Sequence, residues 1–155
     1  MNVDKEIQQL IDNRLLRDES EIQSYEDAII NIMKSDDIKT ICKMCMGFDD
    51  NTEHHEVMYS LVHALEKYST KFNDESSLVE LANGIINMMP HAIKWAEILN
   101  KRVLNHGPSR ANFAKIISTL QVDTRMVIID LLKDLKNRKP DLFANKVDEV
   151  LNGVI

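Results

Sequence analysis

Residues 49–68 read DDNTEHHEVMYSLVHALEKY, an acidic turn that runs directly into an amphipathic helix. Four carboxylates, Asp49, Asp50, Glu53 and Glu56, surround a histidine pair, and no lysine or arginine follows until Lys67. Acidic residues are favourable at a helix start, because the first-turn N–H groups attract negative charge. Four of them exceed what a helix cap requires. The segment therefore predicts a concentrated negative surface, suited to a positively charged partner.

The helical spacing of apolar residues recurs along the whole chain, and no segment alternates at period two for long enough to predict a strand. Glycine (4) and proline (3) are scarce, so few turns are expected. Pro90, Pro108 and Pro140 each stand where a helix is expected to begin, since the first turn needs no donor there. The predicted helices cover residues 3–16, 20–34, 35–47, 53–68, 78–89, 91–104, 109–120, 123–136 and 140–151, with caps at Ser20, at Ser35 or Asp36, at residues 50–52 and at Asp123.

These helices predict an all-α fold with one domain over residues 1–155. A chain of this length can bury roughly 68–70% of its unfolded surface, so it needs no disulfide or metal to fold. About nine short helices joined by short connections are expected to stack as antiparallel pairs, as a HEAT-like stack or an orthogonal helical bundle. No clean sequence repeat establishes a regular array.

Charge is divided unevenly between the two halves of the chain. Residues 1–80 hold 18 acidic and 8 basic residues, a net charge of −10, whereas residues 81–155 carry +4. An acidic chain without a basic arm does not favour nucleic-acid binding. The basic run at 133–139 is expected to compensate a helix C-terminus. No signal segment or apolar run of 18 residues is found, which favours a cytoplasmic protein without membrane contact.

Two motifs could carry chemistry, and both have a structural explanation. Cys42 and Cys45 form C-x-x-C within a predicted helix rather than after a strand, so we interpret them as small core side chains. Together with His54 and His55 they offer zinc-ligand chemistry, but adjacent histidines on a helix point about 100° apart. We therefore predict no cofactor and no metal site.

The remaining candidates favour binding over catalysis. Trp95 aligns with apolar residues at helical spacing and is expected to anchor the core. His55, Tyr59 and His63 are expected to form a polar ridge beside the acidic cluster. No phosphate-binding glycine loop or nucleophile elbow is present, so we predict that the protein is not an enzyme.

Two ordered motifs, DDNTEHHEVMYSLVHALEKY and MMPHAIKWAEILNKRVLN, resemble family 30 of the bacterial immunity proteins. The resemblance covers roughly residues 49–105. It implies an antidote that binds a cognate toxin domain of a contact-dependent growth-inhibition or related polymorphic-toxin system. Many such toxins attack nucleic acids and carry basic clefts, so the toxin could be a nuclease.

From charge, we expect the toxin contact at Asp49, Asp50, Glu53, His55, Glu56 and Tyr59. Two alternatives remain open from the sequence: a helical-repeat adaptor for another host protein, and a metal-dependent enzyme that uses the Cys/His cluster. The oligomeric state is open as well.

Overall fold

The computed structural model describes residues 2–155, and these form nine α-helices, one 3₁₀ helix and no strand. The all-α prediction is confirmed. Each predicted helix corresponds to one observed helix, in the same order along the chain. The helices are α1 (Val3–Asn13), α2 (Glu19–Ile32), α3 (Thr40–Met44), the 3₁₀ helix η1 (Cys45–Gly47), α4 (His55–Ser69), α5 (Asp74–Ile86), α6 (Ile93–Asn105), α7 (Gly107–Ile117), α8 (Val122–Arg138) and α9 (Pro140–Asn152).

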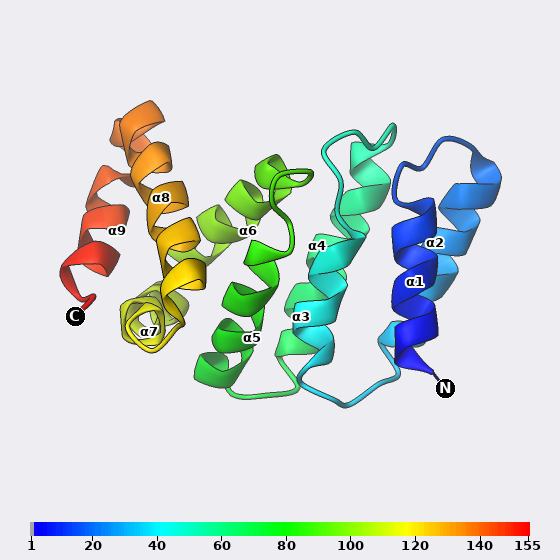
Figure 1. Ribbon diagram of the computed structural model, residues 1–155, viewed down its shortest axis with the longest axis horizontal. Helices are drawn as coiled ribbons and strands as arrows, with labels where there is room; N and C mark the ends of the chain where they lie inside the picture. The colour runs from blue at the N-terminus through cyan, green and yellow to red at the C-terminus, as the bar shows by residue number, and fades with distance from the viewer. Residues whose placement is uncertain (1) are drawn as a thin grey trace.

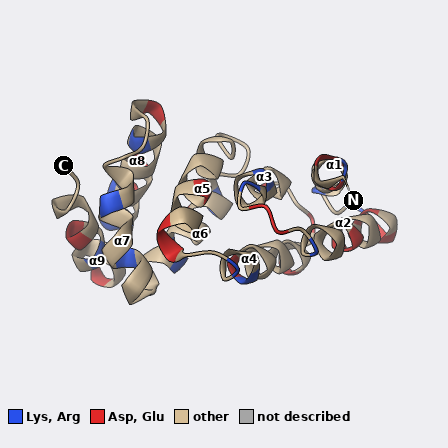
Figure 2. Cartoon of the chain, turned by 90° about the horizontal axis from the view of Figure 1, so that it is seen from below, with Lys and Arg blue, Asp and Glu red and all other residues tan. Residues whose placement is uncertain are grey.

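The helices stand in a row from the N-terminus to the C-terminus, as Figure 1 shows. Helices α1, α3 and α5 lie in one layer and α2, α4 and α6 in the other (Figure 2). The expected packing of helix pairs is confirmed. Helix α7 breaks the regular stacking and is seen nearly end-on in Figure 1. Only His106 separates it from α6, serving as the C-cap of α6 and the N-cap of α7, so the chain turns there without a loop.

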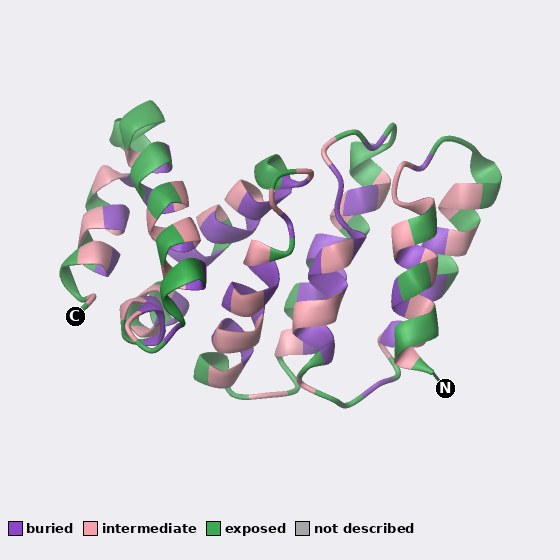
Figure 3. Ribbon diagram, viewed as in Figure 1, coloured by how far each residue is buried: buried purple, intermediate pink, exposed green. Residues whose placement is uncertain are grey.

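Buried apolar side chains form a connected core that runs through every layer, from Ile7 to Val150 (Figure 3). Two glycines allow helices to approach closely. A Cβ at Gly47 would lie 2.8 Å from Leu61 Cδ2, and one at Gly84 would lie 2.5 Å from Cys45 Sγ. The C-x-x-C segment is therefore packed directly against α5. Cys45 is fully buried, which confirms its role in the core, and Cys42 is half-buried.

Helices α2 and α5 begin earlier than predicted because an earlier residue caps each of them. Asp18, not Ser20, caps α2, since its carboxylate accepts a hydrogen bond from Glu21 N at 2.8 Å. Asn73 caps α5 in the same way, accepting from Ser76 N at 2.8 Å. The polar segment before Leu78 is thus the first turn of α5. Asp and Asn side chains are good acceptors for the N–H groups of the first helical turn. Such a residue just before an acidic residue indicates a helix start, and apolar spacing alone misses it.

The third helix begins later than predicted, because contacts from α4 and the turn after it hold the preceding segment out of helical conformation. Tyr68 Oη donates to Asp37 O at 2.8 Å and to Ser35 Oγ at 3.2 Å. Lys71 Nζ donates to Met33 O and Ser35 O. These bonds satisfy backbone carbonyls that a longer helix would have used itself. Helix α3 therefore starts only at Thr40.

The starts of α4 and α6 also differ from the prediction. Neither N-cap residue, His54 for α4 or Ala92 for α6, makes a side-chain cap bond. Pro90 does not open α6 but lies in the turn before it. In the part of the chain that the structure describes, no helix has the length and apolar character needed to span a membrane.

Candidate functional site

The acidic turn before α4 is held by backbone bonds to its neighbours on both sides. Glu53 N donates to Leu15 O at 2.9 Å, in the loop between α1 and α2. Asp50 N donates to His91 O at 2.9 Å, in the turn before α6. His54 Nδ1 donates to Leu16 O at 2.8 Å. The turn is thus fixed in place, and it connects three consecutive helix pairs at one edge of the stack.

Asp49 is buried in this turn, and its carboxylate, its carbonyl and its N–H each contact a different residue. Its carboxylate pairs with Arg14 Nε at 3.2 Å and accepts from Asn51 N at 2.9 Å. Its backbone carbonyl accepts from Trp95 Nε1 at 3.2 Å, and its N–H donates to Met58 Sδ. The Asp49 side chain is 10% exposed and Arg14 24%. This charge is therefore neutralised inside the protein, and its main role is to fix the turn.

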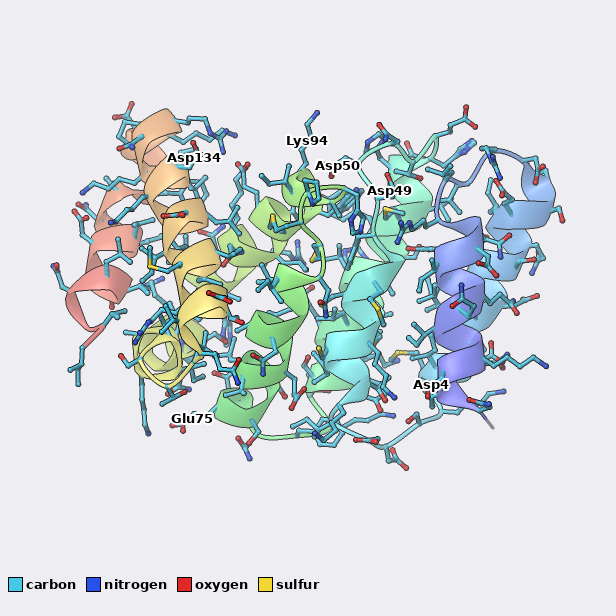
Figure 4. All side chains as sticks on the ribbon, in the orientation of Figure 1. Asp4, Asp49, Asp50, Glu75, Lys94 and Asp134 are labelled. Atoms are coloured by element: carbon cyan, nitrogen blue, oxygen red, sulfur yellow. The ribbon has the colours of Figure 1, made fainter. Side chains whose placement is uncertain are left out.

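Asp50 has a second structural role, because its carboxylate caps a different helix. Both of its oxygens accept from Lys94 N, at 3.2 and 3.1 Å, in the first turn of α6. Figure 4 shows Asp49, Asp50 and Lys94 at the same edge of the molecule, opposite Asp4 and Glu75. The cap that α6 lacks locally is supplied by a residue 44 positions before Lys94 in the chain. Apolar spacing gives no signal for such a long-range cap.

The other four predicted contact residues are available at the surface. Glu53, His55 and Glu56 are exposed, and Tyr59 is half-buried. His55 and Tyr59 pack on Trp95, with ring centroids 6.0 and 5.1 Å away. Trp95 is 1% exposed, which confirms it as a core anchor. The buried Trp95 ring therefore holds the His55 and Tyr59 side chains in place at the surface.

His63 extends this group along α4. Its ring lies 6.1 Å from that of Tyr59, and the side chain is exposed. The predicted ridge of His55, Tyr59 and His63 is thus confirmed as a surface stripe of α4.

Glu53, just before α4, and Glu56, in its first turn, differ electrostatically from Glu21 on the neighbouring helix α2. Glu53 and Glu56 take part in no ion pair within residues 2–155. Glu21 is paired with Arg17 at 2.8 Å, and hydrogen bonds from that guanidinium lower the pKa of Glu21 to about 2. The same bond raises the pKa of Arg17. Uncompensated negative charge therefore remains at Glu53 and Glu56.

The zinc-ligand alternative finds no site in the fold. Among residues 2–155, no three His, Cys, Asp or Glu side chains are grouped so that they could hold a metal. Burial raises the pKa of both the Cys42 and Cys45 thiols, and a thiolate is the form that binds metals and attacks electrophiles. The Nδ1 atom of His54 is already hydrogen-bonded to Leu16 O. The structure does not bring the Cys and His residues together.

The comparisons with known proteins identify the family. The model of immunity protein 30 matches residues 12–113. The chain belongs to the immunity protein 30 family. No curated protein and no solved structure matches it. The family resemblance inferred from the two sequence motifs is thereby confirmed, and the matched segment contains the whole acidic turn.

Membership gives this immunity protein its general function, which is the neutralisation of a cognate toxin. Proteins of this kind inhibit without catalysis, so the chain is not an enzyme. The family also assigns a toxin as partner, in place of the host protein considered for a helical adaptor. The match ends at residue 113, within α7, so α8 and α9 lie outside it.

Proposed function

We propose that this immunity protein captures the toxin domain of a contact-dependent inhibition or related polymorphic toxin through an acidic surface centred on residues 49–59. In this proposal Glu53, His55, Glu56 and Tyr59 contact the toxin, while Asp49 and Asp50 hold the turn that presents them. The chain acts as one domain, residues 1–155, in the cytoplasm that the toxin enters.

The observation that carries the proposal is uncompensated charge on the α2–α4 side. Helix α2 contains four carboxylates and no lysine or arginine (Figure 2). Of these four, only Glu21 forms an ion pair in the described residues. Glu53 lies next to this helix, because its backbone N–H binds the loop that leads into α2. The acidic turn thus lies beside the start of α2, and its exposed Glu53 and Glu56 add to the carboxylates of that helix.

A negative surface of this kind fits a basic toxin. A toxin that cleaves nucleic acid needs a basic cleft for the phosphates. The immunity protein would then present carboxylates where the substrate presents phosphates. Complementary fields also raise association rates, to about 10⁸–10⁹ M⁻¹s⁻¹ at low salt. Fast capture suits an antidote that must act before the toxin does damage.

The test uses the cognate toxin domain and the double variant Glu53→Gln/Glu56→Gln. We expect the association rate at low salt to fall about tenfold, with a smaller fall at high salt, because screening already removes the steering. The control is Asp130→Asn/Asp141→Asn, which removes two exposed charges from α8 and α9. Equal association rates for both double variants would remove the acidic turn from the interface.

A further inference from the structure

A cavity of about 400 Å³ lies at the opposite end of α4 from the acidic turn. It is bounded by the C-terminal halves of α4 and α6, the first turns of α5 and the start of α7. Arg102 on α6 closes one side by pairing with Glu66 on α4. The apolar floor consists of Leu65, Phe72, Leu78, Leu81, Leu99 and Val103.

The polar groups around this floor are mostly hydrogen-bond acceptors. Ser69 Oγ, Thr70 Oγ1 and Ser77 Oγ each donate their single proton to a backbone carbonyl, so only their lone pairs remain. The Arg102 guanidinium donates two of its five N–H groups to Glu66, at 2.8 and 2.7 Å, so its charge is paired with that carboxylate. A side chain that reaches the hydroxyl oxygens and Asp74 therefore meets acceptors and needs to bring donors.

Asp74 places an uncompensated negative charge in the cavity lining. Its carboxylate accepts one bond from Ser109 Oγ and one from Asn112 Nδ2, both at 2.9 Å and both from neutral groups. No ion pair within residues 2–155 includes Asp74. Since Glu66 and Arg102 offset each other, the lining carries one net negative charge when His106, which also lines the cavity, is counted as neutral.

The cavity continues the proposed toxin-binding surface. His55, Tyr59, His63 and Glu66 follow one another at helical spacing on one face of α4. From His55 to Glu66 this stripe is about 16 Å long, at 1.5 Å per residue. A standard interface of about 800 Å² on each partner covers that length. The residues around the cavity, from Leu65 to Ser109, also lie within the segment that matches the family.

We infer that this cavity receives a basic side chain of the toxin, best an arginine. Its aliphatic stem lies on the leucine floor, and its guanidinium donates to Asp74 and to the serine and threonine oxygens. An arginine brings five donors and no acceptor, which matches the acceptor-rich rim. This inference rests on the proposed function and adds a second contact, at the far end of α4.

The first test compares Asp74→Asn with Glu75→Gln. Both residues lie in the first turn of α5 and both connect it to α7, Asp74 through Ser109 and Glu75 through an ion pair with Lys115 at 3.0 Å. Only Asp74 lines the cavity. We expect Asp74→Asn to weaken binding of the cognate toxin domain at least tenfold, and Glu75→Gln less than twofold. Equal affinities for the two variants overturn the inference.

A second pair of variants blocks the cavity without altering its charge. Thr70→Phe places a ring at the rim, and Thr119→Phe is the matched control. Both threonines are exposed and both donate to the carbonyl three residues earlier, at 2.6 and 2.7 Å. We expect only Thr70→Phe to lose toxin affinity, at least tenfold. Circular dichroism confirms that each variant is folded.

The identity of the side chain is tested on the toxin, by changing its surface arginines and lysines to glutamine one at a time. One of these toxin variants should bind the wild-type immunity protein more weakly than the wild-type toxin does. The same toxin variant should bind Asp74→Asn almost as well as the wild-type toxin does, because the interaction that it removes is already lost in Asp74→Asn. If no basic toxin residue couples to Asp74, the inference is overturned. If Asp74→Asn binds normally while Glu53→Gln/Glu56→Gln binds slowly, the inference fails and the proposed function stands. A wild-type chain that does not bind the toxin overturns both.

Discussion

Residues 49–52 and residues 53–59 form one acidic segment in the sequence but have different roles in the structure. Asp49 and Asp50 in the first part direct their carboxylates into the protein, one to Arg14 and the other to the start of α6. Glu53 and Glu56 in the second part direct theirs to solvent. The same chemical group, a carboxylate, thus stabilises the fold in one part and supplies free charge in the other.

This difference shows that carboxylates next to each other in sequence need not act as one charge cluster. Each of the first two is satisfied by groups from another helix pair, which a single sequence does not reveal. The negative charge that remains available to a partner is therefore smaller than the sequence indicates, but the turn holds it more rigidly. We therefore expect substitutions of Asp49 and Asp50 to lower the stability of the fold, in contrast to substitutions of Glu53 and Glu56.

The largest effect is expected for Asp49→Asn. Removing the charge leaves Arg14 partly buried without its partner, and hydrogen bonds to charged groups contribute more than neutral ones. We expect the free energy of unfolding to fall by about 2 kcal/mol, measured by urea denaturation. Glu53→Gln is the control and should change it by less than about 0.5 kcal/mol.

A double-mutant cycle with Arg14→Met separates the ion pair from the packing of the turn. If Asp49 acts through Arg14, the two losses are not additive, and the double variant is little worse than either single one. Equal destabilisation by Asp49→Asn and Glu53→Gln would contradict the division of the acidic segment.

A smaller loss is expected for Asp50→Ala. The variant leaves the Lys94 N–H without its acceptor, and loss of a helix cap typically costs about 1 kcal/mol. Asp50→Asn keeps an acceptor oxygen and should recover most of this loss. Amide hydrogen exchange would show the effect at Lys94 in the first turn of α6, 44 residues away in sequence. Faster exchange at the start of α4 instead would show that Asp50 caps α4, the helix that follows it in the sequence.

The sequence predicts most of the fold because helix existence follows from apolar spacing, which is a local property. Trp95, which is expected in the core from its helical spacing, is buried. Helix starts were less predictable. Asp18 and Asn73 could have been found as caps from sequence, since each precedes an acidic first turn. The late start of α3 could not, because bonds from Tyr68 and Lys71 hold it there.

The candidate site divides in the same way. Exposure of Glu56 follows from its place in the first turn of α4, on the face opposite the buried residues, whereas His55 borders the buried face and packs on Trp95. The burial of Asp49 depends on Arg14, Met58 and Trp95 from three other parts of the chain. The cavity at Asp74 likewise requires four helices to be placed relative to one another. Such features depend on tertiary contacts that no local pattern encodes.

Glu21 provides the smallest expected effect and a third kind of carboxylate, one neutralised at the surface. Hydrogen bonds from Arg17 lower its pKa to about 2 in the folded protein. A depressed folded-state pKa contributes stability that is present above the unfolded value, near 4.5, and is lost as the pH falls towards 2. The stability difference between wild type and Glu21→Gln should therefore be constant at neutral pH and shrink between pH 4.5 and 2. Urea denaturation at a series of pH values measures it, and a difference that stays constant down to pH 2 would show that Arg17 does not stabilise the Glu21 carboxylate.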